Sequence, residues 1–134
     1  MIAFFDTNIL VYAQETGPKG DRARELLAAG GVISVQVLNE LVNVLRRKFR
    51  RSWPEIEKVL EDVDNALDKA TPLTFETHAA AIFLARDHGL HLYDALIVAA
   101  ALEAGCDTLF SEDLQHQRSF GDLRIVNPFS DISL

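Results

Sequence analysis

Residues 1–13 read MIAFFDTNILVYA and place a single carboxylate between two apolar segments. Residues 2–5 form a short, continuously apolar run, which is typical of a strand buried on both faces. Asp6 follows this run directly, and residues 9–12 are again mostly apolar. Because a buried, unpaired carboxylate costs several kcal/mol, Asp6 requires a cation, a hydrogen-bond network or a position at the mouth of a cleft.

The composition is that of one ordinary globular domain, which we expect to span residues 1–134. Hydrophobic residues make up 49% of the chain and charged residues 25%, and this length suffices for a sizeable core. The single cysteine, Cys106, excludes a disulfide framework and favours a reducing compartment, so we expect a cytoplasmic protein. Asp6 interrupts the N-terminal apolar run, which argues against a signal peptide. No apolar run, residues 95–102 included, approaches the ~20 residues of a membrane span.

The charge distribution has two interpretations. A net charge of −7 disfavours nucleic acid as a partner, since phosphate binders are usually basic. Five of the 13 basic residues nevertheless lie within six positions, namely Arg46, Arg47, Lys48, Arg50 and Arg51. This run is either the solvated end of a helix, where cations suit the dipole, or a binding surface.

Strand-like and helix-like segments alternate along the chain. Strands are predicted at residues 2–5, 32–33, 72–75, 108–110 and 123–126. Helices are predicted at residues 21–29, 34–51 with Ser34 as the cap, 53–69, 77–88 and 94–104. This alternation predicts an α/β fold with a central parallel sheet flanked by helices. Ligands of such sheets bind beyond the carboxyl ends of the strands, where Asp6 lies.

Four acidic residues lie next to apolar segments, where a carboxylate is less easily solvated than on an open surface. Asp6 follows the first strand, and Glu40 lies among apolar neighbours in VQVLNELVNVL, residues 35–45. Asp94 opens the apolar helix LYDALIVAAAL, residues 92–102, and Asp113 follows the strand TLF in LFSEDLQH, residues 109–116. Each has an ordinary alternative explanation: Asp6 and Asp94 as helix N-caps, Glu40 as an exposed helix residue and Asp113 as a loop carboxylate.

The expected topology favours a common site for these acids. Parallel strands bring Asp6 and Asp113 to one edge of the sheet, and helix N-termini such as that near Asp94 reach the same edge. Clustered carboxylates stay ionised together only around a cation, and oxygen-only ligands select Mg²⁺ or Mn²⁺. The corresponding chemistry is phosphodiester hydrolysis by a metal-activated water. Asn8 and Ser111 add neutral oxygen contacts or hold a metal-bound water.

Other sites and folds fit less well. The histidines, at positions 78, 88, 91 and 116, lack the spacing of a zinc site, and His116 is either a surface residue or a phosphate contact. A receiver domain needs a lysine after the last strand, but no lysine follows Lys69. A haloacid-dehalogenase-type phosphatase needs a second aspartate where Asn8 stands, and the P-loop pattern is absent from the sequence.

Four blocks of sequence resemble the PIN-domain ribonucleases, and more narrowly the VapC toxins of toxin–antitoxin pairs. These blocks are FFDTNILVY, NE, YDALIVAAALEAG and LFSEDLQH, and they occur in the family's order over essentially the whole chain. The resemblance implies a small PIN-like α/β fold and Mg²⁺- or Mn²⁺-dependent endoribonuclease activity on RNA. It also implies that Asp6, Glu40 and Asp94 ligate the metal, while Asp113 completes the pocket or binds the metal through water.

The resemblance extends to supporting residues and partners. Asn8 and Ser111 match the polar positions that accompany the acids, whereas the role of Glu112 is less defined. Related toxins often read SEDLQHG, and Gln117 replaces that glycine, which places the following turn in question.

The family also implies a homodimer and a VapB-like antitoxin that wraps the toxin, with the helix pair of residues 34–69 as the clamp. The basic run is then an RNA or antitoxin contact, through Arg46, Arg47, Arg50 and Arg51. The alternative is a catalytically inactive PIN-fold protein that acts as an RNA- or protein-binding scaffold or regulatory subunit. The intact set of acids argues against this alternative.

Overall fold

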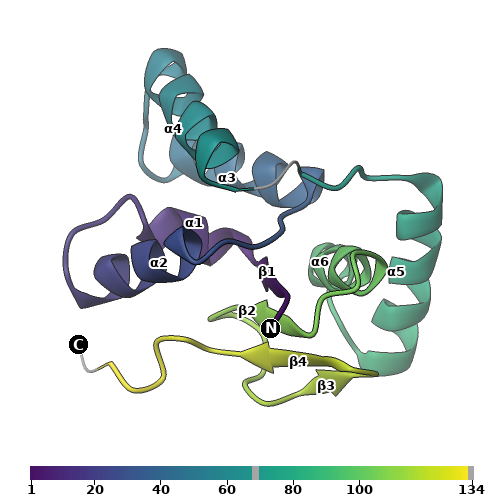
Figure 1. Ribbon diagram of the computed structural model, residues 1–134. Coiled ribbons are helices and arrows are strands. Elements are labelled where there is room, and N and C mark those ends of the chain that lie inside the picture. Colours follow the sequence, from purple (N-terminus) through teal and green to yellow (C-terminus); the bar gives the residue numbers. More distant parts are fainter. Residues whose placement is uncertain (68–69, 133–134) are drawn as a thin grey trace.

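The computed structural model describes residues 1–67 and 70–132, which form a mixed α/β fold (Figure 1). The expected fold class is confirmed. Along the chain the elements are β1 (Ala3–Phe5), α1 (Thr7–Tyr12), α2 (Pro18–Ala28), α3 (Val35–Arg47), α4 (Trp53–Ala66), α5 (Phe75–His88), α6 (Leu92–Glu103), β2 (Thr108–Phe110), β3 (Ser119–Phe120) and β4 (Leu123–Val126).

The sheet is parallel except at one edge. Its strand order is β1-β2-β4-β3, and β1, β2 and β4 run parallel while β3 pairs antiparallel with β4. Phe5 at the end of β1 lies opposite Phe110 at the end of β2, and their rings stack with centroids 5.9 Å apart. The segments that follow these two strands therefore leave the sheet side by side. The two-residue strand β3 has too little pattern to be seen in the sequence.

Two of the predicted strands differ in the structure. Val32 extends the sheet beyond β1 through a single parallel bridge to Phe4, so the segment at residues 32–33 is shorter than a strand. The predicted strand at residues 72–75 is wrong. Helix α5 already begins at Phe75, because the Thr74 hydroxyl accepts a hydrogen bond from the Thr77 backbone N–H at 3.1 Å and so caps this helix.

The helix starts follow capping chemistry, but several ends differ from the expected ones. Ser34 caps α3 as predicted, and Ser52 with Glu55 forms a capping box at the start of α4. Helix α2 begins at Pro18, earlier than predicted, because proline suits a first helical position. Helix α3 ends at Arg47 rather than at residue 51, so the basic run continues beyond the helix. The predicted end of the next helix, Lys69, lies outside the described residues.

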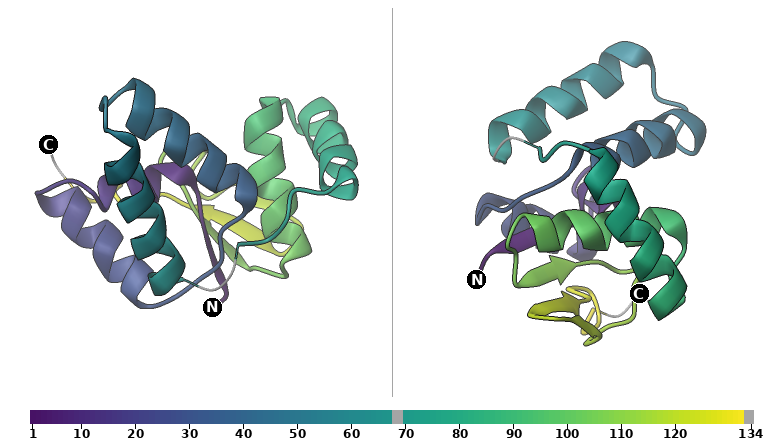
Figure 2. Two further views of the ribbon diagram at one scale, coloured as in Figure 1. Left: turned by 90° about the horizontal axis from the view of Figure 1, so that it is seen from above. Right: turned by 90° about the vertical axis from the view of Figure 1, so that its right-hand side faces the viewer.

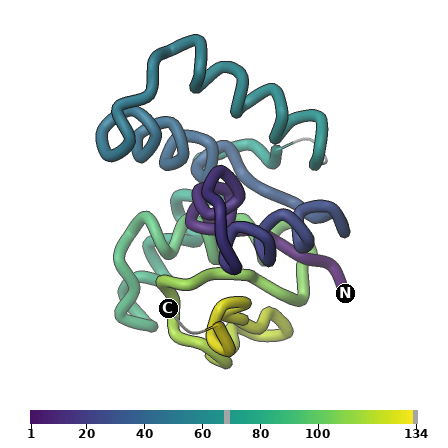
Figure 3. Tube along the Cα trace, turned by 90° about the vertical axis from the view of Figure 1, so that its left-hand side faces the viewer, coloured from purple at the N-terminus to yellow at the C-terminus, as the bar shows by residue number. Residues whose placement is uncertain are grey.

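The helices form two paired blocks around the sheet. Helices α3 and α4 pack together, and α4 is farthest from β3 and β4 in Figures 1 and 3. Helices α5 and α6 form the second block, which lies to the right of the first in the left-hand view of Figure 2 and contacts it through α3 and α6. Residues 95–101 of α6 are all buried, as its uniformly apolar sequence predicts. Within residues 1–67 and 70–132, no helix has the length and apolar character of a membrane span.

Candidate active site

A cleft of about 460 Å³ lies beyond the carboxyl ends of β1 and β2, and we call it the acidic cleft. The structure places all four predicted acids on its walls, from four separate segments. Asp6 follows β1, Glu40 belongs to α3, Asp94 lies in the first turn of α6 and Asp113 lies in the loop after β2. The topology thus brings together residues that are up to 107 positions apart in the sequence (113 − 6).

Asp6 serves both as a helix cap and as a wall of the acidic cleft. One carboxylate oxygen, Oδ1, accepts the Thr7 backbone N–H at 2.7 Å and caps α1. The other oxygen, Oδ2, accepts the Ser111 hydroxyl at 2.7 Å and the Asn8 amide at 3.4 Å. The capping explanation and the cleft explanation are therefore both correct, and only 4% of Asp6 is exposed.

Burial and the charges of neighbouring carboxylates raise the pKa values of Asp6, Glu40 and Asp94. Burial raises the pKa of Asp6 to about 6, against the lowering effect of its bonds from Ser111 and Thr7, and the charges of Asp113 and Asp94 add to the rise. Burial likewise raises the pKa of the half-buried Glu40 to about 7, with the charge of Asp6 as the next cause. The pKa of Asp94 is raised by burial and by the charge of Asp113. The four carboxylates therefore lie within electrostatic reach of one another.

The explanations of Asp94 as a helix N-cap and of Glu40 as an exposed helix residue are both wrong. Helix α6 begins at Leu92 with His91 in the cap position, so Asp94 is inside the first turn and is not an N-cap. Glu40 is partly buried rather than exposed, and its carboxylate accepts a hydrogen bond from the Gln36 amide at 3.3 Å.

Asn8 and Ser111 hold two of the acids in position. The Asn8 amide donates to Asp113 Oδ2 at 3.2 Å, and its carbonyl oxygen accepts the Glu112 backbone N–H at 3.1 Å. Besides donating to Asp6, the Ser111 hydroxyl oxygen accepts the Asp113 backbone N–H at 3.2 Å. These two polar residues thus tie the end of β1 to the loop after β2.

Glu112 is engaged outside the group of four acids. It accepts the Tyr12 hydroxyl at 2.6 Å and forms a salt bridge with Lys19 at 2.7 Å. Burial raises the pKa of Glu112, but the bonds from Lys19 and Tyr12 outweigh this effect and leave the pKa below its usual value. Glu112 therefore joins α1 and α2 to the loop after β2. The sequence held no signal for this contact, because Lys19 lies 93 positions away.

The basic residues of positions 46–51 have different surroundings: some make local contacts and others line the acidic cleft or the groove beside it. The Arg46 guanidinium lies over the Trp53 ring at 4.9 Å, and Arg51 pairs with Glu55 at 3.6 Å. Arg50 is exposed in a turn with φ +53°. Lys48, in contrast, lines the acidic cleft, while the exposed Arg47 lines an adjacent groove. The run is therefore neither wholly a solvated helix end nor one continuous surface.

Gln117 retains a backbone conformation that favours glycine. Its φ is +70°, in the left-handed region, and its backbone N–H donates to the Ile125 carbonyl at 2.9 Å. The neighbouring His116 ring accepts the Asn127 backbone N–H at 2.9 Å, which supports the surface interpretation of this histidine. The glutamine at position 117 thus occupies a turn that a glycine would adopt without strain.

Replacing Gln117 by glycine should raise the stability of the protein. Relief of left-handed strain contributes about 1–2 kcal/mol, while the freer unfolded chain costs about 0.5–1 kcal/mol. We expect a net gain of up to about 1.5 kcal/mol, measured as a higher midpoint in urea or thermal unfolding. Gln115→Gly in the same loop is the control, because φ at Gln115 is not positive. A loss of stability equal to that of the control would contradict the strain argument.

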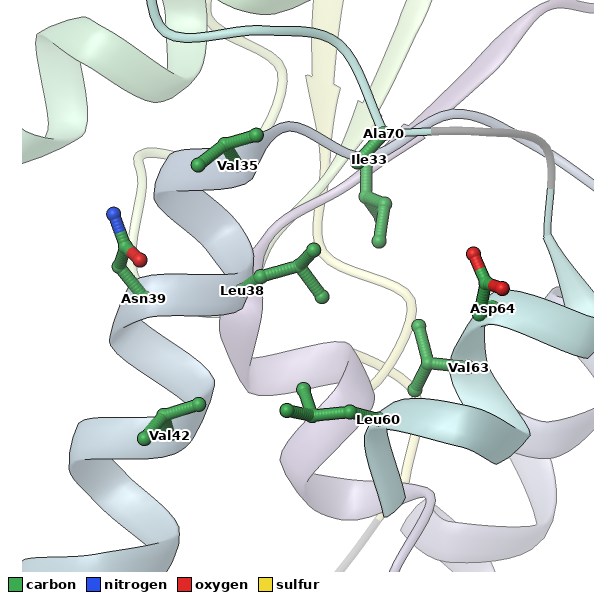
Figure 4. Close-up of a pocket in the computed structure, with 9 residues that line it drawn as sticks. All are labelled: Ile33, Val35, Leu38, Asn39, Val42, Leu60, Val63, Asp64 and Ala70. Carbon is green, nitrogen blue, oxygen red and sulfur yellow. The ribbon is translucent and has the colours of Figure 1, made fainter. Parts of the chain in front are cut away.

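A second cavity, of about 390 Å³, lies between α3 and α4 and is mainly apolar (Figure 4). Leu38 of α3 points toward Leu60 and Val63 of α4 in this view, and the polar Asn39 and Asp64 lie on opposite sides of the cavity. Its lining includes a single acid, Asp64, in contrast to the acidic cleft. It lies on the helix pair that the sequence suggests as the clamp for an antitoxin.

The donor atoms of the acidic cleft suit a hard divalent cation. Carboxylate oxygens from four segments and the amide oxygen of Asn8 are the ligand types that Mg²⁺ and Mn²⁺ prefer. Across residues 1–67 and 70–132, no three His, Cys, Asp or Glu side chains stand close enough to form a finished metal site. The cleft thus offers oxygen ligands from four segments to a divalent cation.

Several solved structures are similar to this chain. VapC20 of Mycobacterium tuberculosis, described as a sarcin–ricin loop cleaving toxin, is 18% identical with a TM-score of 0.68, over 83% of this chain and 89% of that one. A toxin–antitoxin complex from Klebsiella pneumoniae is 22% identical with a TM-score of 0.70, over 94% and 97%. VapBC2 of Rickettsia felis, bound to a promoter DNA fragment, is 23% identical with a TM-score of 0.65, over 93% and 97%. At these identities the likeness shows a shared fold.

Sequence comparison defines the family. None of the curated proteins compared with this chain matches it. The PIN domain family profile, in contrast, matches residues 3–120, a range that contains all six helices, the described strands up to β3 and the four acids of the cleft. The chain therefore belongs to the PIN domain family.

Proposed function

We propose that this protein is an endoribonuclease that hydrolyses RNA phosphodiester bonds with the help of Mg²⁺ or Mn²⁺. The observation that carries the proposal is the acidic cleft, in which Asp6, Glu40, Asp94 and Asp113 converge from four segments. Stability alone does not account for this arrangement, because burial and neighbouring carboxylates raise the pKa values of Asp6 and Glu40. A divalent cation offsets such repulsion, and the family profile supports a nuclease.

The carboxylates have distinct parts in this proposal. Asp6, Glu40 and Asp94 would hold the ion, and Asp113 would hold it directly or through a water. When bound, the ion lowers the pKa of a water molecule and stabilises negative charge on the leaving oxygen.

The chain's own residues supply orientation. Three donors, from Thr7, Asn8 and Ser111, fix the Asp6 carboxylate, and the Asn8 amide fixes Asp113. Such second contacts keep acidic ligands aligned before a cation or substrate arrives. Lys48 lines the same cleft and is placed to contact a phosphate oxygen of the substrate.

We further propose that the protein is the toxin of a toxin–antitoxin pair, with a VapB-like antitoxin as its partner. Two of the similar structures are complexes of this kind by their descriptions. The apolar cavity between α3 and α4 supports an apolar side chain of the antitoxin as its occupant, since Leu38, Leu60 and Val63 offer it a hydrophobic surface. The exposed Arg46 and Arg50 nearby suit acidic antitoxin residues.

A homodimer and a cytoplasmic location complete the proposal. Helix α5 exposes Ile82 and Phe83 by 45% and 57%, and apolar side chains gathered on one helix often mark an interface. The buried thiol of Cys106 suits a reducing compartment. Light scattering at several protein concentrations measures the assembly state directly.

The first test is cleavage of labelled RNA by purified protein with Mg²⁺, with Mn²⁺ and with EDTA. We expect cutting with either ion and its loss in EDTA, because the acids alone repel the RNA phosphates. An inactive scaffold, the second candidate, would bind RNA or a protein partner without cutting under any of these conditions. Cleavage that persists undiminished in EDTA would contradict the role of a metal.

A further inference from the structure

An open groove of about 530 Å³ adjoins the acidic cleft along α3, and we call it the α3 groove. Its floor is one face of the helix, because its residues recur at intervals of three and four positions from Gln36 to Arg47. Tyr93, from the first turn of α6, forms the opposite wall. Glu40 and Val44 line both the groove and the cleft, so the two spaces are continuous.

The side chains of the α3 groove differ in kind from those of the cleft. Amide groups of Asn39 and Asn43 are exposed in it, and each offers a donor pair and an acceptor side by side. Tyr93 is 61% exposed, so its ring is accessible to a ligand that enters the groove. Arg47 adds a permanent positive charge at one end of the groove.

We infer that the α3 groove is a subsite for one unpaired nucleotide of the RNA, next to the bond that is cut. The Tyr93 ring stacks on the base, Asn39 and Asn43 pair with the base edge, and Arg47 contacts a neighbouring phosphate. The inference rests on the proposed nuclease function and extends it to substrate selection. Because Glu40 lines both the groove and the acidic cleft, a nucleotide in the groove would lie directly beside the acids of the cleft.

The chemistry of the groove favours a nucleotide over a peptide. Sequence-specific recognition of RNA uses splayed bases that stack on aromatic rings and form hydrogen bonds along their edges, and Tyr93 with the two asparagines supplies both. An acidic peptide would suit Arg47, but its carboxylates offer no flat face to stack on the Tyr93 ring. A paired base is excluded from such a stack, because its faces are covered by its neighbours in the duplex. The substrate is therefore a single-stranded segment or loop.

The test begins with binding, which requires no cleavage. The probe is an unstructured, fluorescein-labelled RNA of about ten nucleotides, and the protein carries Asp6→Asn so that the RNA stays intact. In this background we expect Tyr93→Ala to weaken binding by about 5- to 100-fold, the range for loss of one base–aromatic stack. Tyr93→Phe keeps the ring and should bind within about threefold of the parent. Phe75→Ala, which removes an exposed ring outside the groove, is the matched control and should leave binding unchanged.

The second measurement addresses base selection. With Asp6 intact, Asn43→Ala should relax the preference for one base beside the cut when a pool of random RNA is cleaved and its ends are sequenced. Arg124→Gln, which removes an exposed cation of β4 outside the groove, should leave that preference unchanged. An unaltered preference in Asn43→Ala would overturn the role of the amides.

The outcomes separate this inference from the proposed function. If the protein with Asp6 intact cuts RNA but Tyr93→Ala binds the probe as tightly as Phe75→Ala does, the subsite is overturned and the nuclease stands. If Tyr93→Ala weakens binding of the antitoxin but leaves RNA binding unchanged, the groove belongs to the protein partner and the inference is overturned as well. If no RNA is cut with either ion, the proposed function fails, while the binding comparison still tests the groove.

Discussion

Replacement of Asp6 by asparagine is expected to lower RNA cleavage on the order of 10²–10³-fold, while the protein stays folded. The variant removes the most buried charge of the acidic cleft, which is 4% exposed, and leaves a neutral ligand that holds a divalent cation weakly. The fold survives because the asparagine carbonyl oxygen still accepts the Thr7 backbone N–H that caps α1. The measurement is initial rates with Mn²⁺, beside circular dichroism of the same samples.

The stability of this variant separates the two roles of Asp6. In metal-free buffer near neutral pH, the melting temperature should stay the same or rise, because a charge whose pKa burial raises to about 6 has been removed. A clear fall would mean that the cap and the Ser111 bond require the carboxylate itself. Asp122→Asn, in the exposed turn between β3 and β4, is the control and should retain full activity. Full activity in Asp6→Asn would exclude Asp6 from the chemistry.

Mn²⁺ should stabilise the protein strongly at about pH 8 and weakly at about pH 5. The pKa of Asp6 rises from 3.8 to about 6 on folding, and that of Glu40 from 4.5 to about 7. Between these values the folded chain binds more protons than the unfolded chain, so these two groups make the metal-free protein less stable as pH rises from about 4 to about 7. At about pH 8 the acids are ionised, and a bound cation offsets this loss of stability. At about pH 5 the cation must compete with protons for the same carboxylates.

The expected size of the effect is set by mass action. At a free Mn²⁺ concentration about 100 times the dissociation constant, the free energy of unfolding rises by about 2.7 kcal/mol, or roughly 5–10 °C in melting temperature. Thermal unfolding with Mn²⁺ and with EDTA at both pH values measures it, and Glu40→Gln should reduce the shift at the higher pH. A shift that is equal at the two pH values would indicate binding away from the acids.

The sequence predicts those features that rest on local chemistry or on strong periodicity. The strand before Asp6, the cap at Ser34 and the buried helix α6 are all present in the structure. The parallel topology that follows from the alternation of strands and helices was enough to bring Asp6 and Asp113 to one edge of the sheet. Catalytic roles for these acids remain a prediction, whereas their common location is observed.

The features that the sequence does not predict depend on tertiary contacts or on very short segments. The Lys19–Glu112 salt bridge forms only because α2 packs beside the loop after β2. Strand β3 has two residues, and its pairing with β4 depends on the turn at Gly121 rather than on a pattern. The α3 groove needs Tyr93 opposite the polar face of α3, and these elements are far apart in the chain.

The four acids come from two consecutive parts of the chain, so the acidic cleft is complete only when both parts are present. Asp6 and Glu40 belong to the part of the chain that ends with α4, and Asp94 and Asp113 belong to the part that begins with α5. Strands β1 and β2, which hold the two parts together by direct pairing, also come from different halves. A gene divided between α4 and α5 would therefore encode two fragments, each with two of the four acids. The proposed nuclease activity would then report the association of the two fragments, which is the property required of a split reporter.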